Sequence, residues 1–166
     1  MMKEKMQEVI CVEIRFAEIQ DVPGILALLK QVGQVHHLGR PDIFRAGAQK
    51  YGASQVIDML NKPGTPIFVA VEADKVLGYC FCFLKKHEKD PVIADYTELY
   101  IDDLCVDENC RGQHIGKQLY ETACRYAKNC HCYSVTLNVW SCNESAMRFY
   151  EKMGLKPQKI GMEQVL

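Results

Sequence analysis

The chain has 166 residues, of which 48% are hydrophobic and 25% are charged, and its formal net charge is −1. A chain of this length can bury one sizeable core, so we expect a single domain over residues 1–166. The charge lacks the basic excess of nucleic-acid-binding domains, which predicts no nucleic-acid partner. No apolar run approaches a membrane span and the first residues hold no signal sequence, which predicts no membrane association and a cytoplasmic location.

Hydrophobic periodicity and turn residues divide the chain into alternating strands and helices, and this order predicts one α/β unit. In chain order, the expected elements are a strand over 9–16, a helix beginning after Asp21, a loop over 33–47, a second helix ending before Lys62, strands over 67–72, 76–84 and 98–106, a helix from Ile115, a strand over 135–140, a helix after Ser141 and a last strand near Ile160.

The nine cysteines do not indicate a disulfide scaffold, because their number is odd and several lie within apolar segments. We therefore expect reduced thiols. The run from Cys130 to Cys132 has metal-ligand side chains, but no second pair of ligands stands at the spacing of a zinc site. The sequence therefore predicts no bound metal.

The segment from Leu99 to Gly116 carries the strongest functional signal. Its pattern is that of a β-branched strand, a short polar loop and a glycine-bearing turn that leads directly into an amphipathic helix. Unpaired backbone N–H groups and the positive end of the helix dipole lie at such a helix start, where Arg111 adds a formal charge. This arrangement predicts a binding site for a phosphate group.

Two common phosphate loops do not match this segment. A Walker loop needs four residues between its glycines, but Gly112 and Gly116 enclose only three, and Gln118 follows Lys117 where Ser or Thr is required. A dinucleotide-binding fingerprint needs Gly-x-Gly-x-x-Gly, which occurs nowhere in the chain. The phosphate group is therefore expected to belong to another class of ligand.

The segment instead resembles the coenzyme A pyrophosphate loop of the GCN5-related N-acetyltransferase (GNAT) superfamily, with His114 where a glycine is usual. Residues 143–155 resemble the late helix of the same superfamily in their asparagine, alanine, Phe-Tyr pair and closing glycine. Independently of this resemblance, Ser141 and Glu144 form a capping box that predicts a helix start. Tyr150 lies on the apolar stripe of this helix, where it is either a core tyrosine or, as the resemblance implies, a catalytic residue.

The resemblance implies a single-domain GNAT-type α/β fold, with a mixed central sheet of about six or seven strands, helices on both faces and a splay between two central strands. It also implies an acetyl-CoA-dependent N-acetyltransferase that uses a primary amine of a small molecule or peptide as acceptor, and we allow for a homodimer. The residues implied to contact acetyl-CoA are Leu104, Cys105, Val106, Arg111, Gly112, Gln113, His114, Ile115, Gly116, Lys117 and Asn143.

Direct attack by an amine on the thioester needs a base for the amine proton and an acid for the departing thiolate. The resemblance makes Tyr150 the general acid, and a reference pKa of about 10 keeps its proton in place at neutral pH. Glu98 and Asp102 are alternative bases, with Glu98 slightly favoured by its spacing from Arg111. Each of them is equally a carboxylate that is solvated or only holds the substrate, and strand alternation places both on one face unless a bulge intervenes.

The sequence does not identify the acceptor. The loop between the first two helices supplies His37 and Arg40, and together with Asp103 these residues suit a substrate that has both an amine and an acidic group. A non-catalytic coenzyme A-binding sensor or partner module is the alternative function, which the presence of Tyr150 and of the strand acids opposes. A thiol redox protein is a third option, opposed by the absence of a Cys-x-x-Cys motif.

Overall fold

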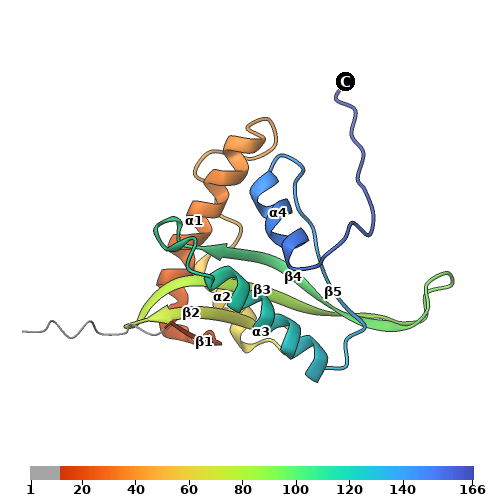
Figure 1. Ribbon diagram of the computed structural model, residues 1–166, viewed down its shortest axis with the longest axis horizontal. Coiled ribbons are helices and arrows are strands. Elements are labelled where there is room, and N and C mark those ends of the chain that lie inside the picture. Colours follow the sequence, from red (N-terminus) through yellow and green to blue (C-terminus); the bar gives the residue numbers. More distant parts are fainter. Residues whose placement is uncertain (1–11) are drawn as a thin grey trace, which may run out of the picture.

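An open mixed sheet of five strands, in the order β1-β2-β3-β4-β5, lies at the centre of the computed structural model, which describes residues 12–166 (Figure 1). Neighbours from β1 to β4 are antiparallel, whereas β4 and β5 are parallel. The mixed α/β sheet expected from the sequence is confirmed, with five strands among these residues rather than six or seven. The strands are β1 (Glu13–Phe16), β2 (Ile67–Glu72), β3 (Lys75–His87), β4 (Tyr96–Val106) and β5 (Ser134–Leu137).

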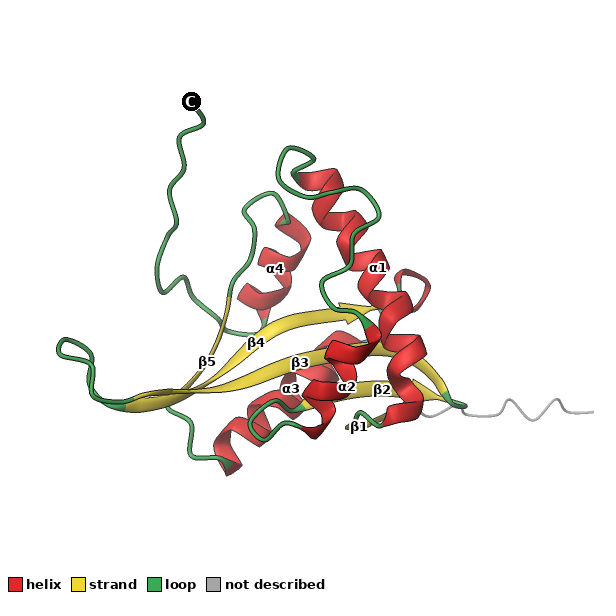
Figure 2. Ribbon diagram, turned by 180° about the vertical axis from the view of Figure 1, so that it is seen from behind, coloured by secondary structure: helices red, strands yellow, loops and turns green. Residues whose placement is uncertain are grey.

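Helices cover both faces of the sheet, as the front and back views show (Figures 1 and 2). α1 (Val22–Gly39) and α2 (Ala53–Asn61) pack on one face, and α3 (Ile115–Asn129) packs on the other. α4 (Glu144–Lys152) contacts the start of α3. Two 3-10 turns, Ile19–Asp21 and Glu108–Cys110, precede α1 and α3.

The two faces of the sheet have separate hydrophobic cores, because side chains alternate along each strand. Tyr79 and Phe81 of β3 are buried against α1 and α2. Leu99 and Ile101 of β4 are buried against α3, beside Leu119. The alternation therefore fixes which β4 side chains face α1 and α2.

β4 and β5 separate partway along their length. Their pairing ends at Ile101 and Leu137, although β4 continues to Val106. At the same point β4 carries a bulge, since Phe81 pairs with Asp103 while the next residue of β3 pairs with Ile101. The splay expected from the sequence is confirmed, and it begins at Asp102. Because β5 loses its partner strand there, it ends at Leu137, whereas the sequence predicted a strand over 135–140.

The loop expected over residues 33–47 is wrong in its first half, because α1 continues to Gly39. Gly33 lies inside the helix, and a Cβ atom at this position would lie 2.0 Å from the backbone oxygen of Ala48. This glycine therefore allows the following loop to pack against the helix, and the helix tolerates it despite its low propensity.

The strand expected near Ile160 does not form. Within the described residues, the segment after α4 runs as a tail without regular secondary structure, away from the sheet (Figure 1). A strand is held by backbone hydrogen bonds to a neighbouring strand, and among the described residues the sheet contains only β1 to β5. At the other end of the chain, β1 begins at Glu13, and residues 9–11 of the expected first strand lie outside the described residues.

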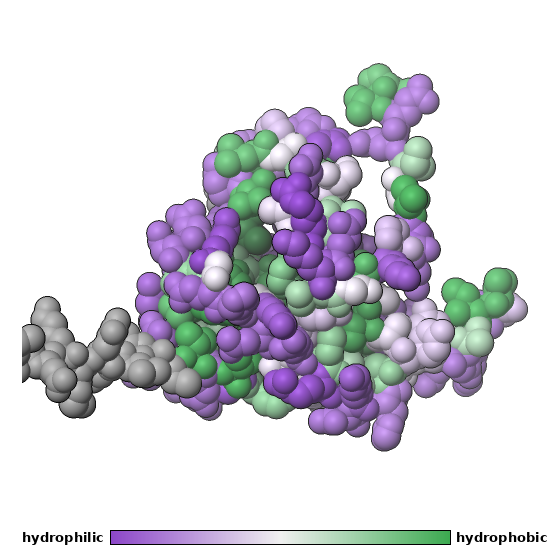
Figure 3. All heavy atoms as spheres, in the orientation of Figure 1, coloured by the Kyte–Doolittle hydropathy of each residue, from purple (hydrophilic) through white to green (hydrophobic). Residues whose placement is uncertain are grey.

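In the part of the chain that the structure describes, no helix has both the length and the apolar character needed to cross a membrane. Hydrophobic side chains are nevertheless exposed at two places that Figure 3 shows in green, the tip of the β3–β4 hairpin and the tail. Val92 at the hairpin tip is 89% exposed, and Met162 in the tail is 89% exposed. Both places project from the body of the protein (Figure 1).

Candidate active site

Three carboxylates of β4 share the face of the sheet that is covered by α1 and α2. Strand alternation places Glu98 and Asp102 on this face, as expected from their spacing. The bulge adds Asp103 to the same face, so that two consecutive carboxylates lie side by side. Their partners confirm the direction, since Asp102 contacts Tyr51, which precedes α2, and Asp103 contacts Tyr79 of the core beneath α1.

Asp102 makes the shortest side-chain contacts of the three. Its Oδ2 accepts a hydrogen bond from the Tyr51 hydroxyl at 2.6 Å and lies 2.8 Å from Lys50 Nζ. The Lys50 ammonium also donates to the backbone oxygen of Asp102 at 3.0 Å. Burial and the nearby Asp102 carboxylate raise the pKa of Tyr51 above its usual range, so this hydroxyl remains a proton donor to Asp102.

Asp103 has a different environment. The Tyr79 hydroxyl donates a hydrogen bond to Asp103 Oδ2 at 2.9 Å. Burial raises the pKa of Asp103 to about 6, against the opposing effects of the Tyr79 hydrogen bond and the Lys50 charge. A carboxylate that titrates near neutral pH can accept a proton and release it again during turnover.

Glu98 lies in the paired part of β4, before the splay. It stands opposite Ser134 of β5 and is only 8% exposed. One of its oxygens lies 3.1 Å from His87 Nε2 of β3, and the other accepts a hydrogen bond from Thr136 Oγ1 of β5 at 2.9 Å. Glu98 therefore connects three strands through hydrogen bonds.

The loop before α3, residues 111–114, which we call the anion loop, has a backbone suited to binding an anion. Gly112 has φ 79° and His114 has φ 62°, both in the left-handed region. The histidine thus adopts the backbone conformation that a glycine would adopt without steric cost. Gln118 N–H donates to the backbone oxygen of His114 at 3.0 Å as the first helical bond, which leaves the preceding N–H groups of α3 without acceptors in the helix. Arg111 is exposed beside them.

The start of α4 is capped by Asn143 and not by Ser141, so the expected capping box is wrong. Asn143 Oδ1 accepts a hydrogen bond from the backbone N–H of Ala146 at 3.2 Å and one from Ser145 Oγ at 3.1 Å. The residue that the resemblance places against the pantetheine arm is therefore also the residue that fixes the first turn of α4.

Tyr150 lies on α4 between two other aromatic rings. Its ring centre lies 5.0 Å from that of Phe149 and 6.5 Å from that of Tyr120 of α3. Phe149 in turn is in van der Waals range of Gly116 at the start of α3, where a Cβ atom would lie 3.5 Å from its ring. Burial raises the pKa of Tyr150 well above its usual range, so this residue keeps its proton.

His37 and Arg40 have partners within the protein. His37 Nδ1 lies 2.7 Å from the backbone oxygen of Phe44. Arg40 forms ion pairs at 2.8 Å with Asp42 and with Glu163 of the tail. Within residues 12–166, the hydrogen bonds and ion pairs of these two side chains do not reach the β4 carboxylates, with which they were expected to share a substrate.

The contacts of the β4 carboxylates include residues that sequence reasoning missed. Lys50 and Tyr51 precede Asp102 by about fifty residues, and no local pattern connects them to β4. Tyr79 follows the alternation of a buried strand, and the sequence therefore marks it as core and not as a partner of Asp103. Contacts of this range are decided only when the strands and helices are assembled.

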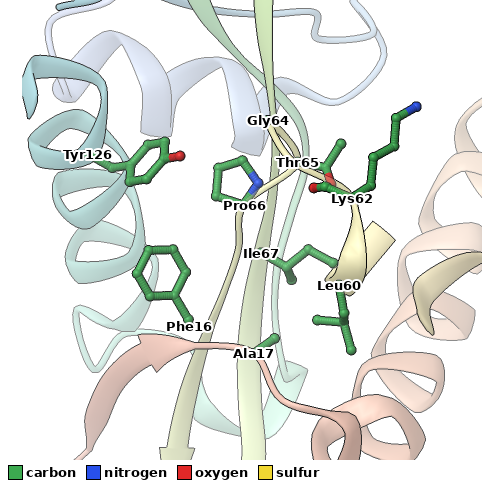
Figure 4. A pocket seen from close by; sticks show the side chains of 9 residues that line it. All are labelled: Phe16, Ala17, Leu60, Lys62, Gly64, Thr65, Pro66, Ile67 and Tyr126. Carbon is green, nitrogen blue, oxygen red and sulfur yellow. The ribbon is translucent and has the colours of Figure 1, made fainter. Parts of the chain in front are cut away.

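A cavity of about 300 Å³ lies at the opposite edge of the sheet, between the end of β1, the loop before β2 and Tyr126 of α3 (Figure 4). Lys62 is the charged side chain among its lining residues. β2 and β3 separate this edge from β4 and β5. The cavity therefore holds none of the candidate catalytic groups.

Within residues 12–166, no group of three or more histidine, cysteine or acidic side chains is arranged to hold a metal ion. The cysteines in this range are free thiols, including Cys130 and Cys132. Burial raises the pKa of the Cys105 thiol, at the splay, to about 12, which keeps it protonated.

The chain is similar to known proteins over most of its length. Residues 34–155 match the acetyltransferase (GNAT) family. Glucosamine 6-phosphate N-acetyltransferase of Trypanosoma brucei brucei is 23% identical over 160 residues, which cover 95% of this chain and 97% of that protein. Peptidyl-lysine N-acetyltransferase YjaB of Salmonella typhimurium is 28% identical over 146 residues, covering 87% and 83%.

A solved structure of a tetramutant of the BH1408 protein from Bacillus halodurans is 33% identical, with a TM-score of 0.88, and the match covers 93% of this chain and 99% of that one. The family match spans the β4 carboxylates, the anion loop and Tyr150. The chain therefore belongs to the acetyltransferase (GNAT) family.

Proposed function

We propose that the protein transfers an acetyl group from acetyl-CoA, bound in the splay between β4 and β5, to a primary amine of a small molecule or peptide. One observation carries this proposal. The splay begins at Asp102, beside the Asp103 carboxylate, and β4 leads from there directly to the anion loop before α3. Acetyl-CoA has a thioester at one end and phosphate groups at the other. β4 and the loop that follows it offer carboxylates to the first and a phosphate site to the second.

The chain offers suitable groups to each part of acetyl-CoA. β4 has no β5 partner beyond Ile101. The backbone groups that follow on this side of β4 therefore make no hydrogen bonds to β5 and can bind the pantetheine arm and the acetyl carbonyl. These groups belong to Leu104, Cys105 and Val106. Asn143 is proposed to contact the same arm. The pyrophosphate is proposed to lie against the α3 start, with contacts from Arg111, Gly112, Gln113, His114, Ile115, Gly116 and Lys117.

Acetyl-CoA supplies an activated acetyl thioester, and the chain supplies the proton transfers. A carboxylate of β4 accepts the proton of the amine, and the neutral Tyr150 hydroxyl protonates the departing sulfur. Glu98 and Asp102 were the expected bases. The position of the splay favours Asp102 and its neighbour Asp103 over Glu98, because Glu98 lies where β4 and β5 are still paired.

The similar proteins differ in acceptor, since one is described as acting on glucosamine 6-phosphate and another on peptidyl lysine. We propose that the acceptor shares their primary amine. Recognition of an acidic group by His37 and Arg40 would require both side chains to leave their present partners.

The test has two stages. Calorimetry is expected to show acetyl-CoA binding, and ligand at a hundred times its dissociation constant stabilises the fold by about 2.7 kcal/mol. A panel of amines, including glucosamine 6-phosphate and a lysine peptide, is then followed by the release of free thiol. Arg111→Glu is expected to lower acetyl-CoA affinity while leaving the melting temperature without ligand nearly unchanged.

Tyr150→Phe separates catalysis from binding, because it keeps the aromatic ring and removes only the proton donor. Its kcat is expected to fall about 10²-fold or more with acetyl-CoA binding intact. Binding without thiol release for any amine would favour the alternative, a non-catalytic coenzyme A-binding module. The absence of binding at millimolar acetyl-CoA would overturn the proposed function itself.

A further inference from the structure

Lys50 places a primary amine at the first residue of the splay. Its Nζ lies 2.8 Å from Asp102 Oδ2, donates to the Asp102 backbone oxygen at 3.0 Å and lies 5.6 Å from the centre of the Tyr51 ring. A carboxylate, a carbonyl and an aromatic ring are the groups that hold a primary ammonium in proteins. The lysine thus occupies a site suited to the amine of an acceptor.

The bulge makes this backbone oxygen available. Asp102 is the extra residue that β3 leaves without a counterpart, and β5 has already ended its pairing with β4 at this point. Leu104, the first of the residues proposed to hold the acetyl thioester, follows two positions later. At roughly 3.3 Å per residue, Leu104 lies about 7 Å along the strand from Asp102, which the amine contacts, and a flexible four-carbon side chain can span such a distance.

The position of Lys50 allows its side chain to move. It belongs to the loop before α2, and its side chain is 43% exposed. The side chain of its partner Asp102 is only 11% exposed. The contact therefore joins a long, partly exposed side chain to a carboxylate that is largely buried. The ammonium can leave Asp102 by rotation about its own bonds without unfolding a helix or strand.

We propose that Lys50 is itself an acetyl acceptor, modified within its own chain, and this inference rests on the proposed function. The Lys50 nitrogen forms a bond to the acetyl carbonyl carbon, and the bond from that carbon to the coenzyme A sulfur breaks. Asp102 Oδ2 takes one proton of the ammonium before the attack, and the nitrogen loses a second proton to water when the tetrahedral intermediate collapses. The Tyr150 hydroxyl gives a proton to the departing sulfur. The products are Nε-acetyl-lysine, free coenzyme A and one net proton, and proton exchange with water restores both side chains.

Acetylation has a consequence for the site. A neutral amide cannot keep the ion pair with Asp102, so the carboxylate of the modified protein keeps its Tyr51 hydrogen bond but has lost the positive charge beside it. The charge facing an incoming amine becomes more negative by one unit. The modification therefore changes how the same site receives a cationic acceptor.

The experiment incubates the purified full-length protein with acetyl-CoA and no other amine, and follows each lysine by peptide mass spectrometry. The mass increment of one acetyl group is expected on Lys50 at least about tenfold faster than on Lys75, because a positioned amine reacts at high effective concentration. Lys75 is a matched control, since it is also exposed and also lies near a carboxylate, 3.8 Å from Asp107. The Lys50 rate is expected not to change with protein concentration, and Tyr150→Phe is expected to slow it without slowing Lys75.

The outcomes separate the two proposals. Thiol release with added amines but equal rates at Lys50 and Lys75 would overturn the inference and leave the proposed function standing. A Lys50 rate that rises in proportion to protein concentration would also overturn it, because the transfer would then occur between chains. Failure to bind acetyl-CoA would overturn both. Lys50→Arg keeps the positive charge beside Asp102, and it is expected to remove the acetylated peptide.

Discussion

Asp102 and Asp103 are neighbours in the sequence, yet their surroundings give them different chemistry. Asp102 is held by a lysine and a tyrosine, whereas Asp103 has the Tyr79 hydroxyl and a pKa raised to about 6 by burial. A carboxylate with this pKa is ionised at neutral pH and is still basic enough to accept a proton. Asp102 and Asp103 are the same type of residue, so their different surroundings are what distinguishes them as candidate bases.

The pH dependence of turnover tests this assignment. If Asp103 is the base, kcat/KM is expected to fall below a pH of about 6, because the protonated carboxyl cannot accept the amine proton. Asp103→Asn is expected to lose this acidic limb and to regain activity as the pH approaches the pKa of the amine. Asp102→Asn and Glu98→Gln are the matched variants. Retention of the limb in Asp103→Asn would assign the base to whichever of them loses it.

The raised pKa of Asp103 also predicts how the stability of the fold depends on pH. Its pKa in the folded state, about 6, lies above the reference value of about 3.9, so folding favours the protonated form. The stabilisation is fully present below pH 4 and is lost as the pH rises through 6. Asp103→Asn is neutral throughout, and its stability relative to the unmodified protein is expected to rise by up to about 2 kcal/mol between pH 4 and 8. Urea unfolding at both pH values measures this, and a pH-independent difference would contradict it.

His114 is in a strained backbone conformation, and its replacement has a predictable sign. A side chain in the left-handed region costs about 1–2 kcal/mol, whereas glycine avoids this cost but loses about 0.5–1 kcal/mol through its greater freedom in the unfolded chain. His114→Gly is therefore expected to stabilise the fold by up to about 1 kcal/mol in thermal or urea unfolding. His114→Ala keeps the Cβ atom and is expected not to stabilise. Equal effects of the two variants would show that φ at this position is not positive.

At the scale of elements, the position of α3 on the sheet determines where the anion loop lies. α3 approaches β3 closely at Gly78, where a Cβ atom would lie 2.9 Å from the backbone oxygen of Cys105 and 3.1 Å from Leu119. One of these atoms belongs to the splayed part of β4 and the other to α3. Gly78 therefore fixes the distance between the two elements that form the proposed acetyl-CoA site.

Gly78→Ala is expected to destabilise the fold by about 1–3 kcal/mol, since a backbone atom cannot move aside as a flexible side chain can. Acetyl-CoA affinity is expected to fall as well, because α3 must shift relative to β4. Gly161→Ala is the control, since that position has no atom within 4 Å and is expected to change stability by less than about 0.5 kcal/mol. Unfolding and calorimetry measure the two effects, and a Gly78→Ala protein of unchanged stability would disprove the close approach.

At the scale of the whole molecule, the tail and the outer edge of β5 remain uncovered in a single chain. Ile160 and Val165 are each 78% exposed, and β5 is the last strand of the sheet. Contiguous exposed apolar residues and an open strand edge favour association between proteins. The homodimer that the sequence leaves open is therefore expected to involve the tail.

Deletion of residues 158–166 tests this expectation. The full chain is expected to have twice its monomer mass of 18.9 kDa in sedimentation equilibrium at micromolar concentration, and the shortened chain is expected to have the monomer mass. Acetyl-CoA binding should persist, because the residues proposed to bind it lie before the tail. A replacement of Glu163 by Gln, which removes only the ion pair with Arg40, serves as the control. A full chain that sediments as a monomer would contradict the role of the tail.

The sequence by itself determined most of the elements and the turn that leads into α3, because both depend on residues that are close together in the chain. The apolar positions of α3 recur at helical spacing, and the turn at Ala73 and Asp74 follows from local residue types, although both adopt positive φ. The helix start after Arg111 is likewise a local property. At Gly33 and Ile160 the expectation was wrong. Gly33 lies inside α1 and packs closely against Ala48, and the segment around Ile160 forms no strand.

Only the tertiary structure decided the surroundings of the candidate catalytic groups. The bulge at Asp102 depends on the register between β3 and β4, and the splay depends on where β5 stops pairing. The contacts of Asp102 with Lys50 and of Asp103 with Tyr79 join residues far apart in the chain. The partners of a side chain set its charge and its pKa, and those partners are brought together by the packing of the sheet and helices, which no local pattern specifies.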